Sequence, residues 1–253
     1  MDGTTPRVDS SVAVVIPAYN EEARIDATVR TVIHYLNDQS WTWELIIIDD
    51  GSRDNTSQKA RTAASGEERV KLVRHEVNHG KGWALREGFH LADSDHVLFC
   101  DADLSTPIDE LAGFLATAED GYDLVVADRL SDQARILIPQ GFLRRLAGKA
   151  FRAAVASLKL ETRDTQCGYK LLRRTSLEPI IEATQTDRFA FDVELLLRAQ
   201  SAGLRLADRP VSWSNSTGTQ FSLLRDGFAS IVDLMRIRRM AKSLRRAGTG
   251  PSR

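Results

Sequence analysis

The sequence predicts an α/β protein in which a mostly parallel sheet is covered by helices. Short apolar, β-branched runs alternate with helix-length amphipathic segments between residues 12 and 127. This alternation is typical of parallel strands joined by helical crossovers. The strand runs are apolar without interruption, as expected for strands buried on both faces. The crossovers should be right-handed.

The expected strands lie at 12–16, 45–48, 70–73, 96–100 and 123–127. The helices between them are expected at 21–36, from 54 or 55 onward, at 80–91 and at 107–118. Asn20 is a candidate cap for the first helix, and Pro107 suits the first turn of the fourth. Beyond Arg129 the alternation ends. Further helices are expected at about 141–158 and 191–202, and a final amphipathic segment at about 222–244.

These elements predict one domain with a helical tail. A flexible N-terminus over 1–10 precedes a Rossmann-like domain over 11–220. An amphipathic basic tail is expected over 221–246 and a disordered end over 247–253. The length of 253 residues and the hydrophobic content of 42% are ordinary for a globular protein.

The sequence also gives an expectation for the cellular location of the protein. No apolar run reaches the roughly 18 residues of a spanning helix, and residues 1–10 lack the apolar core of a signal peptide. Cys100 and Cys167 have no metal-ligand spacing, so two free thiols in a reducing cytoplasm are expected. We expect no nucleic-acid partner, and the oligomeric state stays open.

Charge divides the chain into an acidic and a basic half. Residues 1–128 carry 11 Lys and Arg against 24 Asp and Glu, whereas residues 129–253 carry 23 against 11. The acidic half suits a cation, and the basic half suits an anionic partner or membrane surface. Segment-by-segment alternation of surface charge is the simpler alternative.

The turn Asp101-Ala102-Asp103 follows the expected strand 96–100. Open α/β sheets bind their ligands at the carboxyl ends of strands. A pair of short carboxylates there suits Mg²⁺ or Mn²⁺, which leaves coordination sites open for phosphate oxygens. A solvated acidic turn or helix cap is the structural alternative.

Two other strand ends carry polar residues. Pro17-Ala18-Tyr19-Asn20-Glu21-Glu22 follows the first strand, and Asp49-Asp50-Gly51-Ser52 follows the second. An aromatic ring and carboxylates at these positions suit a nucleobase and its ribose. A turn with a helix cap explains the first segment equally well. Three acidic strand ends at one edge are explained poorly by capping alone.

The sequence lacks the motifs of several nucleotide-binding and hydrolase classes. No Gly-x-Gly-x-x-Gly follows the first strand, which disfavours dinucleotide oxidoreductases. No P-loop motif occurs, and no Gly-x-Ser-x-Gly nucleophile elbow is present.

The chain resembles the A-fold glycosyltransferases of family 2 in the order of its motifs. The segments are those at 17–22, 49–52, 78–82 (Asn-His-Gly-Lys-Gly) and 101–103. Two later segments narrow the resemblance to the dolichyl-phosphate or polyprenyl-phosphate glucosyltransferases, relatives of the dolichyl-phosphate mannose synthases. They are 164–170 (Asp-Thr-Gln-Cys-Gly-Tyr-Lys) and 189–196 (Phe-Ala-Phe-Asp-Val-Glu-Leu-Leu). The resemblance spans about residues 12–240.

The resemblance implies a fold and a set of roles. It implies a GT-A fold and inverting transfer of a hexose, with UDP-glucose favoured over a GDP-sugar as donor. The donor would be bound by Pro17, Ala18, Tyr19, Glu21, Asp49, Asp50, Lys81 and Ala102. Asp101 and Asp103 would serve the diphosphate and sugar, with Asp103 as the metal ligand. Arg129 would bind the acceptor phosphate, with Arg144 or Arg145 as the second arginine. Gln166 and Lys170 are further candidates for acceptor binding.

The charge of the acceptor decides what chemistry it needs. A phosphate monoester has a second pKa of about 6, so it is largely dianionic at neutral pH and needs no general base. Arginine forks suit such an acceptor. Asp164 and Asp192 are candidates for orienting the acceptor or sugar. A helix cap is the alternative role for Asp192, and a surface charge is the alternative for Lys170.

The tail predicts contact with a membrane surface. Its apolar positions fall on one helical stripe and basic residues follow without an acid: Phe221, Leu224, Phe228, Ile231, Val232 and Met235, then Arg236, Arg238, Arg239, Lys242, Arg245 and Arg246. This pattern suits an interfacial helix on anionic lipid, which would place the protein peripherally on the cytoplasmic face. The stripe could instead pack on the sheet.

Two other functions remain open at this stage. The same donor chemistry could serve a soluble small-molecule acceptor. A nucleotide-sugar-binding protein without catalysis is the alternative from another class, and donor hydrolysis would separate it from an enzyme. A nucleotidyltransferase fits least, because the first loop is not glycine-rich.

Overall fold

The computed structural model describes residues 10–138, 153–214 and 225–248, and in the last segment the side chains of 233–244. Its main sheet has seven strands in the order β3-β2-β1-β4-β7-β5-β8. In chain order the strands are β1 (Ser11–Ala18), β2 (Thr42–Asp49), β3 (Val70–Arg74), β4 (His96–Phe99), β5 (Leu124–Asp128), β7 (Lys170–Arg173) and β8 (Leu206–Pro210). Only β7 pairs antiparallel with its neighbours. The predicted mostly parallel sheet is confirmed.

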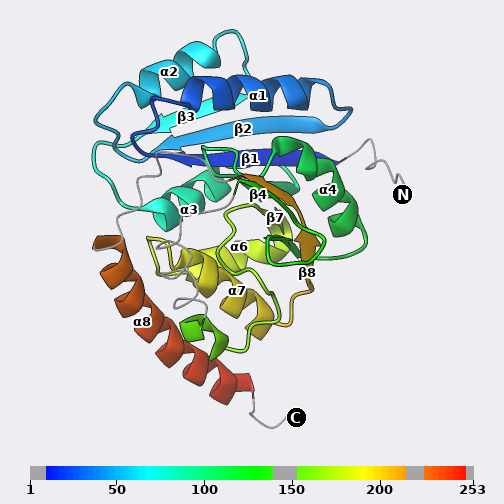
Figure 1. The fold of residues 1–253 in the computed structure, drawn as a ribbon, viewed down its shortest axis with the longest axis vertical. Helices are drawn as coiled ribbons and strands as arrows, with labels where there is room; N and C mark the ends of the chain where they lie inside the picture. Colours follow the sequence, from blue (N-terminus) through cyan, green and yellow to red (C-terminus); the bar gives the residue numbers. More distant parts are fainter. Residues whose placement is uncertain (1–9, 139–152, 215–224, 249–253) are drawn as a thin grey trace.

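Helices cover both faces of this sheet, as Figure 1 shows. They are α1 (Ile25–Asn37), α2 (Thr56–Ala63), α3 (Lys81–Leu91), α4 (Leu111–Glu119), α6 (Arg174–Ala183), α7 (Phe191–Ser201) and α8 (Arg225–Gly248), with a 3-10 turn η1 (Ile108–Glu110) before α4. Helices α1, α2 and α4 pack on one face, and α3, α6 and α7 on the other. Helix α8 packs on the outside of α7.

Strand β1 explains why the strand runs are apolar without interruption. Val12, Val14 and Ile16 point into the core under α1 and α4. Ala13 and Val15 point into the opposite core, under α3 and α7. Because alternate side chains face opposite sides of a sheet, a strand between two helix layers needs an apolar residue at every position.

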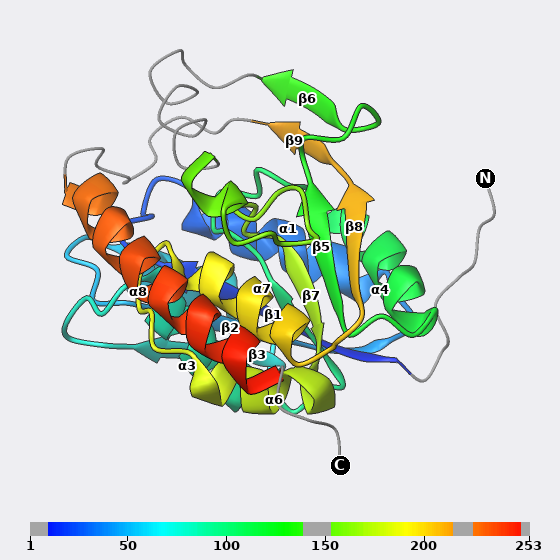
Figure 2. The same ribbon diagram turned by 90° about the horizontal axis from the view of Figure 1, so that it is seen from below.

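A second, two-stranded sheet stands beside the main one. It consists of β6 (Arg135–Ile138) and β9 (Ser212–Ser214), which pair in parallel. Figure 2 shows this ribbon projecting from the end of the molecule where β5 and β8 finish. The sequence did not predict either strand.

One predicted cap is wrong. Helix α1 begins at Ile25 after Arg24, and Asn20 does not cap it. Asn20 instead takes the left-handed backbone conformation, with a φ of 53°. An asparagine tolerates this conformation because its side chain can hydrogen-bond locally.

The tail forms a helix, and its described apolar side chains divide between two faces. Leu234, Ile237 and Ala241 are buried against Val193 and Leu197 of α7. Met235 of the predicted stripe lies on another face and is exposed. The stripe's other members lie outside the side chains that the structure describes, as do 141–152 of the expected helix 141–158. No helix among the described residues is long and apolar enough to cross a bilayer.

Candidate active site

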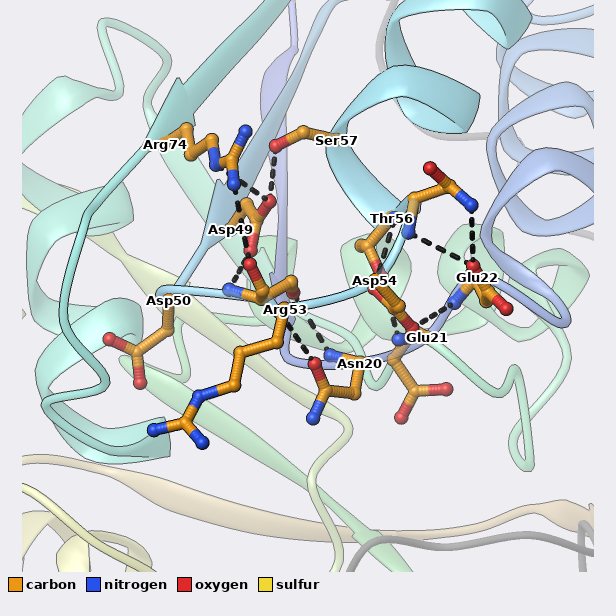
Figure 3. A network of polar contacts seen from close by, with 12 residues as sticks. Asn20, Glu21, Glu22, Asp49, Asp50, Arg53, Asp54, Thr56, Ser57 and Arg74 are labelled. Carbon is orange, nitrogen blue, oxygen red and sulfur yellow. Dashed lines mark hydrogen bonds and ion pairs between the residues drawn. The ribbon is translucent and has the colours of Figure 1, made fainter.

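The loops after β1 and β2 are tied together at the carboxyl edge of the sheet, as Figure 3 shows. The backbone N–H of Asn20 donates to Ser52 Oγ at 2.9 Å, and Asn20 Oδ1 accepts from the N–H of Arg53 at 2.9 Å. The N–H of Glu21 donates to Thr56 Oγ1 at 2.8 Å. These bonds fix the backbone of the predicted donor loop.

The other predicted residues of this loop lie on the same edge. Pro17 and Ala18 end β1, where they pair with Ile48 and Asp49 of β2. Tyr19 follows directly and is partly exposed. Their contact with a nucleobase stays a prediction.

Asp49 and Asp50 point into the protein and accept hydrogen bonds from backbone N–H groups. Asp49 is fully buried and accepts hydrogen bonds from Ser57 Oγ and from the N–H of Ser52. Asp50 accepts from the N–H groups of His79 at 2.8 Å and Gly80 at 2.7 Å. Burial raises the pKa of Asp50. Asp50 therefore shapes the loop that starts α3, and its predicted donor contact stays a prediction.

Helix α3 begins with Lys81, whose ammonium lies on the acidic turn after β4. Lys81 Nζ is 2.5 Å from Asp101 Oδ1. Burial alone would raise the pKa of Asp101, but the charge and hydrogen bond of Lys81, together with the charges of Lys170 and Arg129, hold the pKa below its usual value. The same pair raises the pKa of Lys81 against the effect of burial. Both groups are therefore charged at neutral pH.

Gly168 packs directly on the Asp101 carboxylate. A Cβ at this position would overlap both carboxylate oxygens, although the backbone of Gly168 is not in the left-handed region. The loop 164–170 thus forms one wall of the acidic turn. Gly168 belongs to the segment that carries the family resemblance, but no role was predicted for it.

We expect Gly168→Ala to lower kcat by roughly tenfold to a hundredfold, because a misplaced reacting group has effects of this size. The added methyl must displace Asp101 or the loop backbone. Gly66→Ala is unsuitable as a control, because Gly66 has a φ of 86° and any side chain there would be strained. Gly168→Ser adds a larger side chain at the same position and should lower kcat further than Gly168→Ala. A Gly168→Ala enzyme with parental kcat would contradict this packing argument.

Asp103 lies at the tip of the same turn. Its Oδ1 accepts from the N–H of Ser105 at 2.9 Å, and the intervening Leu104 has a φ of 45°. The carbonyl of Ala102 accepts from Thr28 Oγ1 of α1 at 2.7 Å. The turn is therefore fixed from both sides, with Ala102 buried between the two carboxylates.

Glu21 brings a third carboxyl group toward this turn. Burial raises the pKa of Glu21 to about 7, Arg24 opposes this, and the carboxylates of Asp103 and Asp101 add to it. Three carboxyl groups therefore lie near this turn, and such a group of acids favours the binding of a cation.

The raised pKa of Glu21 predicts a pH effect on stability. Its folded pKa lies above the unfolded value of 4.5, so the folded state holds more protons between these values. The stability of the metal-free protein should fall as pH rises from about 4.5 to 7. Glu21→Gln should reduce this fall in urea unfolding at pH 5 and pH 8, whereas exposed Glu76→Gln should retain it. An identical fall in both variants would contradict the assignment.

Arg129, which is partly exposed, and Asp164, which is buried, form a two-pronged ion pair. Arg129 Nε lies 2.6 Å from Asp164 Oδ2, and the second guanidinium nitrogen is 2.9 Å from Oδ1. The guanidinium also lies 5.5 Å from the ring centre of Trp213 on β9. Burial opposes the charge of both groups, but their pairing lowers the pKa of Asp164 and raises that of Arg129. Asp164 therefore orients Arg129 beside the acidic turn.

Lys170 and Asp192 form a second ion pair, which is enclosed by protein. Lys170 is 0% exposed, its Nζ is 2.6 Å from Asp192 Oδ1, and it also donates to the carbonyl of Cys167. Direct contact of Lys170 with an acceptor would require this pair to open. In this structure the pair joins α7 to the loop 164–170.

The remaining predicted acceptor residues are only partly placed. The N–H of Gln166 donates to Asp164 Oδ1 at 3.3 Å, so Gln166 lies beside the arginine pair. Arg144 and Arg145 lie outside the described residues. Trp213, which no role was predicted for, packs on Arg129.

A divalent ion fits this set of residues. No group of three or more His, Cys, Asp or Glu side chains within the described ranges is arranged as a metal cage. Mg²⁺ is commonly held by one or two carboxylates together with substrate phosphates, so a complete protein cage is not required. Asp103, with Glu21 and Asp101 nearby, supplies such a partial set.

Comparison with known proteins identifies the class of protein that has this fold. The model of the family "Glycosyl transferase family 2" matches residues 13–181. The chain therefore belongs to glycosyltransferase family 2 and is a glycosyltransferase, as predicted.

Its curated relatives narrow the class. The chain is 31% identical to glycosyltransferase AglD of Haloferax volcanii over 85% of its length, but that match spans only 35% of the relative. It is 30% identical to dolichyl-phosphate beta-glucosyltransferase of Homo sapiens, covering 83% of this chain and 69% of that one. The corresponding enzyme of Saccharomyces cerevisiae is 29% identical, over 90% and 74%.

A solved structure has the same fold. Glucosyl-3-phosphoglycerate synthase from Mycobacterium tuberculosis, in complex with uridine diphosphate, superposes with a TM-score of 0.67 at 23% identity. The match covers 90% of this chain and 80% of that one. It supports the predicted GT-A fold.

Proposed function

We propose that this chain transfers glucose, with inversion, from UDP-glucose to a polyprenyl phosphate with the help of Mg²⁺ or Mn²⁺. The carrying observation is that an acidic turn and an oriented arginine lie beside each other. Arg129 is held by Asp164, which belongs to the same loop 164–170 whose Gly168 packs on the Asp101 carboxylate. The relatives named dolichyl-phosphate beta-glucosyltransferase support the choice of sugar and acceptor. The fold neighbour was crystallised with Mn²⁺ and UDP-glucose.

The donor would lie over the acidic turn. Asp103 would hold the divalent ion, which would supply Lewis-acid stabilisation of the charge on the departing diphosphate. Asp101 keeps the Lys81 ammonium beside this position, where it adds a second positive charge. The ordered loops after β1 and β2 would receive the nucleoside.

The acceptor would lie against Arg129. Its guanidinium is held in place by Asp164 and Trp213, so little rotamer entropy is lost on binding a phosphate. A phosphate oxygen then attacks the anomeric carbon as the bond from that carbon to the diphosphate oxygen breaks. The dianionic acceptor carries no proton that must be removed, so no general base is assigned.

We expect Arg129→Ala to raise the KM for a short-chain polyprenyl phosphate by roughly tenfold to a hundredfold, as befits a lost charge-assisted hydrogen bond. The KM for UDP-glucose should change much less. Arg163→Ala, which alters an exposed arginine one residue before Asp164, is the matched control and should leave both values near the parent.

Two outcomes of this experiment are decisive. Equal losses for donor and acceptor would contradict an acceptor site at Arg129. Arg129→Lys keeps a charge opposite Asp164 but loses the guanidinium fork, so it separates acceptor binding from folding. It should fold like the parent but have a raised KM for the acceptor, as Arg129→Ala does.

A further inference from the structure

Exposed aliphatic side chains gather in one short segment that follows Arg129. Leu130 is 44% exposed, Ile136 is 44% exposed and Leu137 is 65% exposed. Among the described residues, the other large hydrophobic side chains with such exposure are Val77 and Met235, which lie on other elements. Ile136 and Leu137 are neighbours in β6, where an irregularity interrupts the pairing with β9 between Ile136 and Ile138. The ribbon thus presents two adjacent aliphatic side chains to solvent.

The ribbon is connected to both halves of the candidate site. Ile136 pairs with Trp213 of β9, the residue that packs on the Arg129 guanidinium. The N–H of Ser214 donates to the carbonyl of Ser105 at 2.8 Å, and the N–H of Ser105 binds Asp103. The exposed aliphatics therefore stand at a fixed position relative to the predicted acceptor and metal residues.

Basic side chains adjoin the exposed aliphatic residues of the ribbon segment. Exposed Arg135 directly precedes Ile136 and partly exposed Arg129 directly precedes Leu130, with exposed Asp132 between them. Helix α8 is a separate element that packs on α7, and it carries further exposed basic side chains: Arg236, Arg238, Arg239 and Lys242. Aliphatic side chains flanked by basic residues are typical of surfaces that bind the interface of anionic bilayers.

We propose that the β6–β9 ribbon inserts Leu130, Ile136 and Leu137 into the hydrocarbon boundary of an anionic bilayer and so holds Arg129 at the level of lipid headgroups. This inference deepens the proposed function by naming the surface that meets the membrane. It differs from the sequence-based prediction, which assigned membrane contact to the α8 stripe.

The test is binding to vesicles of phosphatidylcholine and phosphatidylglycerol in equal parts, without polyprenyl phosphate or sugar donor. Ile136→Ser combined with Leu137→Ser should lower the partition coefficient by roughly tenfold or more. Val77→Ser, at a side chain that is 62% exposed after β3, is the matched control and should bind like the parent. Parental binding by the double variant would overturn the proposal.

A second measurement reports insertion directly. Leu137→Cys can be labelled selectively with an environment-sensitive fluorophore, because Cys100 and Cys167 are buried. Its emission should shift to shorter wavelength on adding vesicles, whereas labelled Val77→Cys should not shift. No shift at position 137 would contradict insertion. The proposal would also be contradicted if the parent is a dimer and the Ile136→Ser, Leu137→Ser variant is a monomer, because the ribbon would then be a contact between two copies of the chain.

These readouts involve no glycosyl transfer. If the proposed reaction fails while vesicle binding depends on the ribbon, the membrane inference stands alone. If transfer to a lipid acceptor occurs but the ribbon variants bind vesicles normally, only the membrane inference fails.

Discussion

Replacing Asp192 by alanine should lower the free energy of unfolding by about 3–5 kcal/mol, which is typical for breaking a buried ion pair. The change leaves the Lys170 ammonium inside the protein with only the Cys167 carbonyl as its partner. The effect is large because Lys170 has no exposed surface through which water could solvate it. Urea unfolding followed by circular dichroism measures it.

The double variant Lys170→Met with Asp192→Leu is the informative control. Removing both charges replaces the pair by apolar side chains of similar size, which is often neutral or stabilising. We therefore expect the double variant to recover most of the stability that Asp192→Ala loses. If Asp192→Ala alone unfolds at the parental urea concentration, the pair does not carry the energy assigned to it.

The double variant also separates stability from catalysis. The ion pair fixes the carbonyl of Cys167, next to the Gly168 backbone that packs on Asp101. A stable double variant with reduced kcat would identify Lys170 and Asp192 as positioning residues for the acidic turn. Unchanged KM values for donor and acceptor would support that assignment over direct substrate contact.

Asp103→Asn should lower kcat by roughly a hundredfold to a thousandfold, the size typical of losing one preorganised electrostatic contact to the developing charge. The change is nearly isosteric, and the amide oxygen can still accept the hydrogen bond from Ser105. Folding should therefore be preserved. Asp109→Asn, six residues further on in η1 and exposed, is the matched control.

A binding measurement tests the same residue without turnover. Mn²⁺ binding in the presence of UDP, followed by electron paramagnetic resonance, should weaken in Asp103→Asn and not in Asp109→Asn. Parental Mn²⁺ affinity and parental kcat in Asp103→Asn would contradict the metal role.

Local pattern predicted the first half of the fold well. The five expected strands all occur. Strands buried on both faces need unbroken apolar runs, and such runs lie at 12–16 of β1, 45–48 of β2 and 124–127 of β5. The cap at Asn20 failed because tertiary hydrogen bonds to Ser52 and Arg53 hold this residue in another conformation. Local sequence propensity carries no information about such tertiary hydrogen-bond partners.

The second half was harder to predict because its strands depend on distant partners. Strand β7 pairs with β4 and β5, and no strand was predicted over its residues. Strands β6 and β9 have four and three residues and occupy a separate ribbon. Strands this short carry little pattern of their own.

The candidate site was predicted in outline but not in its pairings. The acids at the ends of parallel strands could be found because strand ends meet at one edge. That Lys81 pairs with Asp101, or Arg129 with Asp164, depends on how loops far apart in the chain come together. The sequence also does not reveal that Asp49 and Asp50 both turn inward, where they accept hydrogen bonds from backbone N–H groups.

The most direct test is to incubate the protein with radiolabelled UDP-glucose, Mg²⁺ and a polyprenyl phosphate, and to follow the label into an organic extract. We expect the label to enter the organic phase as a mild-acid-labile glycolipid, with UDP released in equal amount, and Asp103→Asn to abolish most of this transfer. Label that stays in the aqueous phase with every polyprenyl phosphate, while a soluble phosphate acceptor becomes glucosylated, would contradict the proposed function.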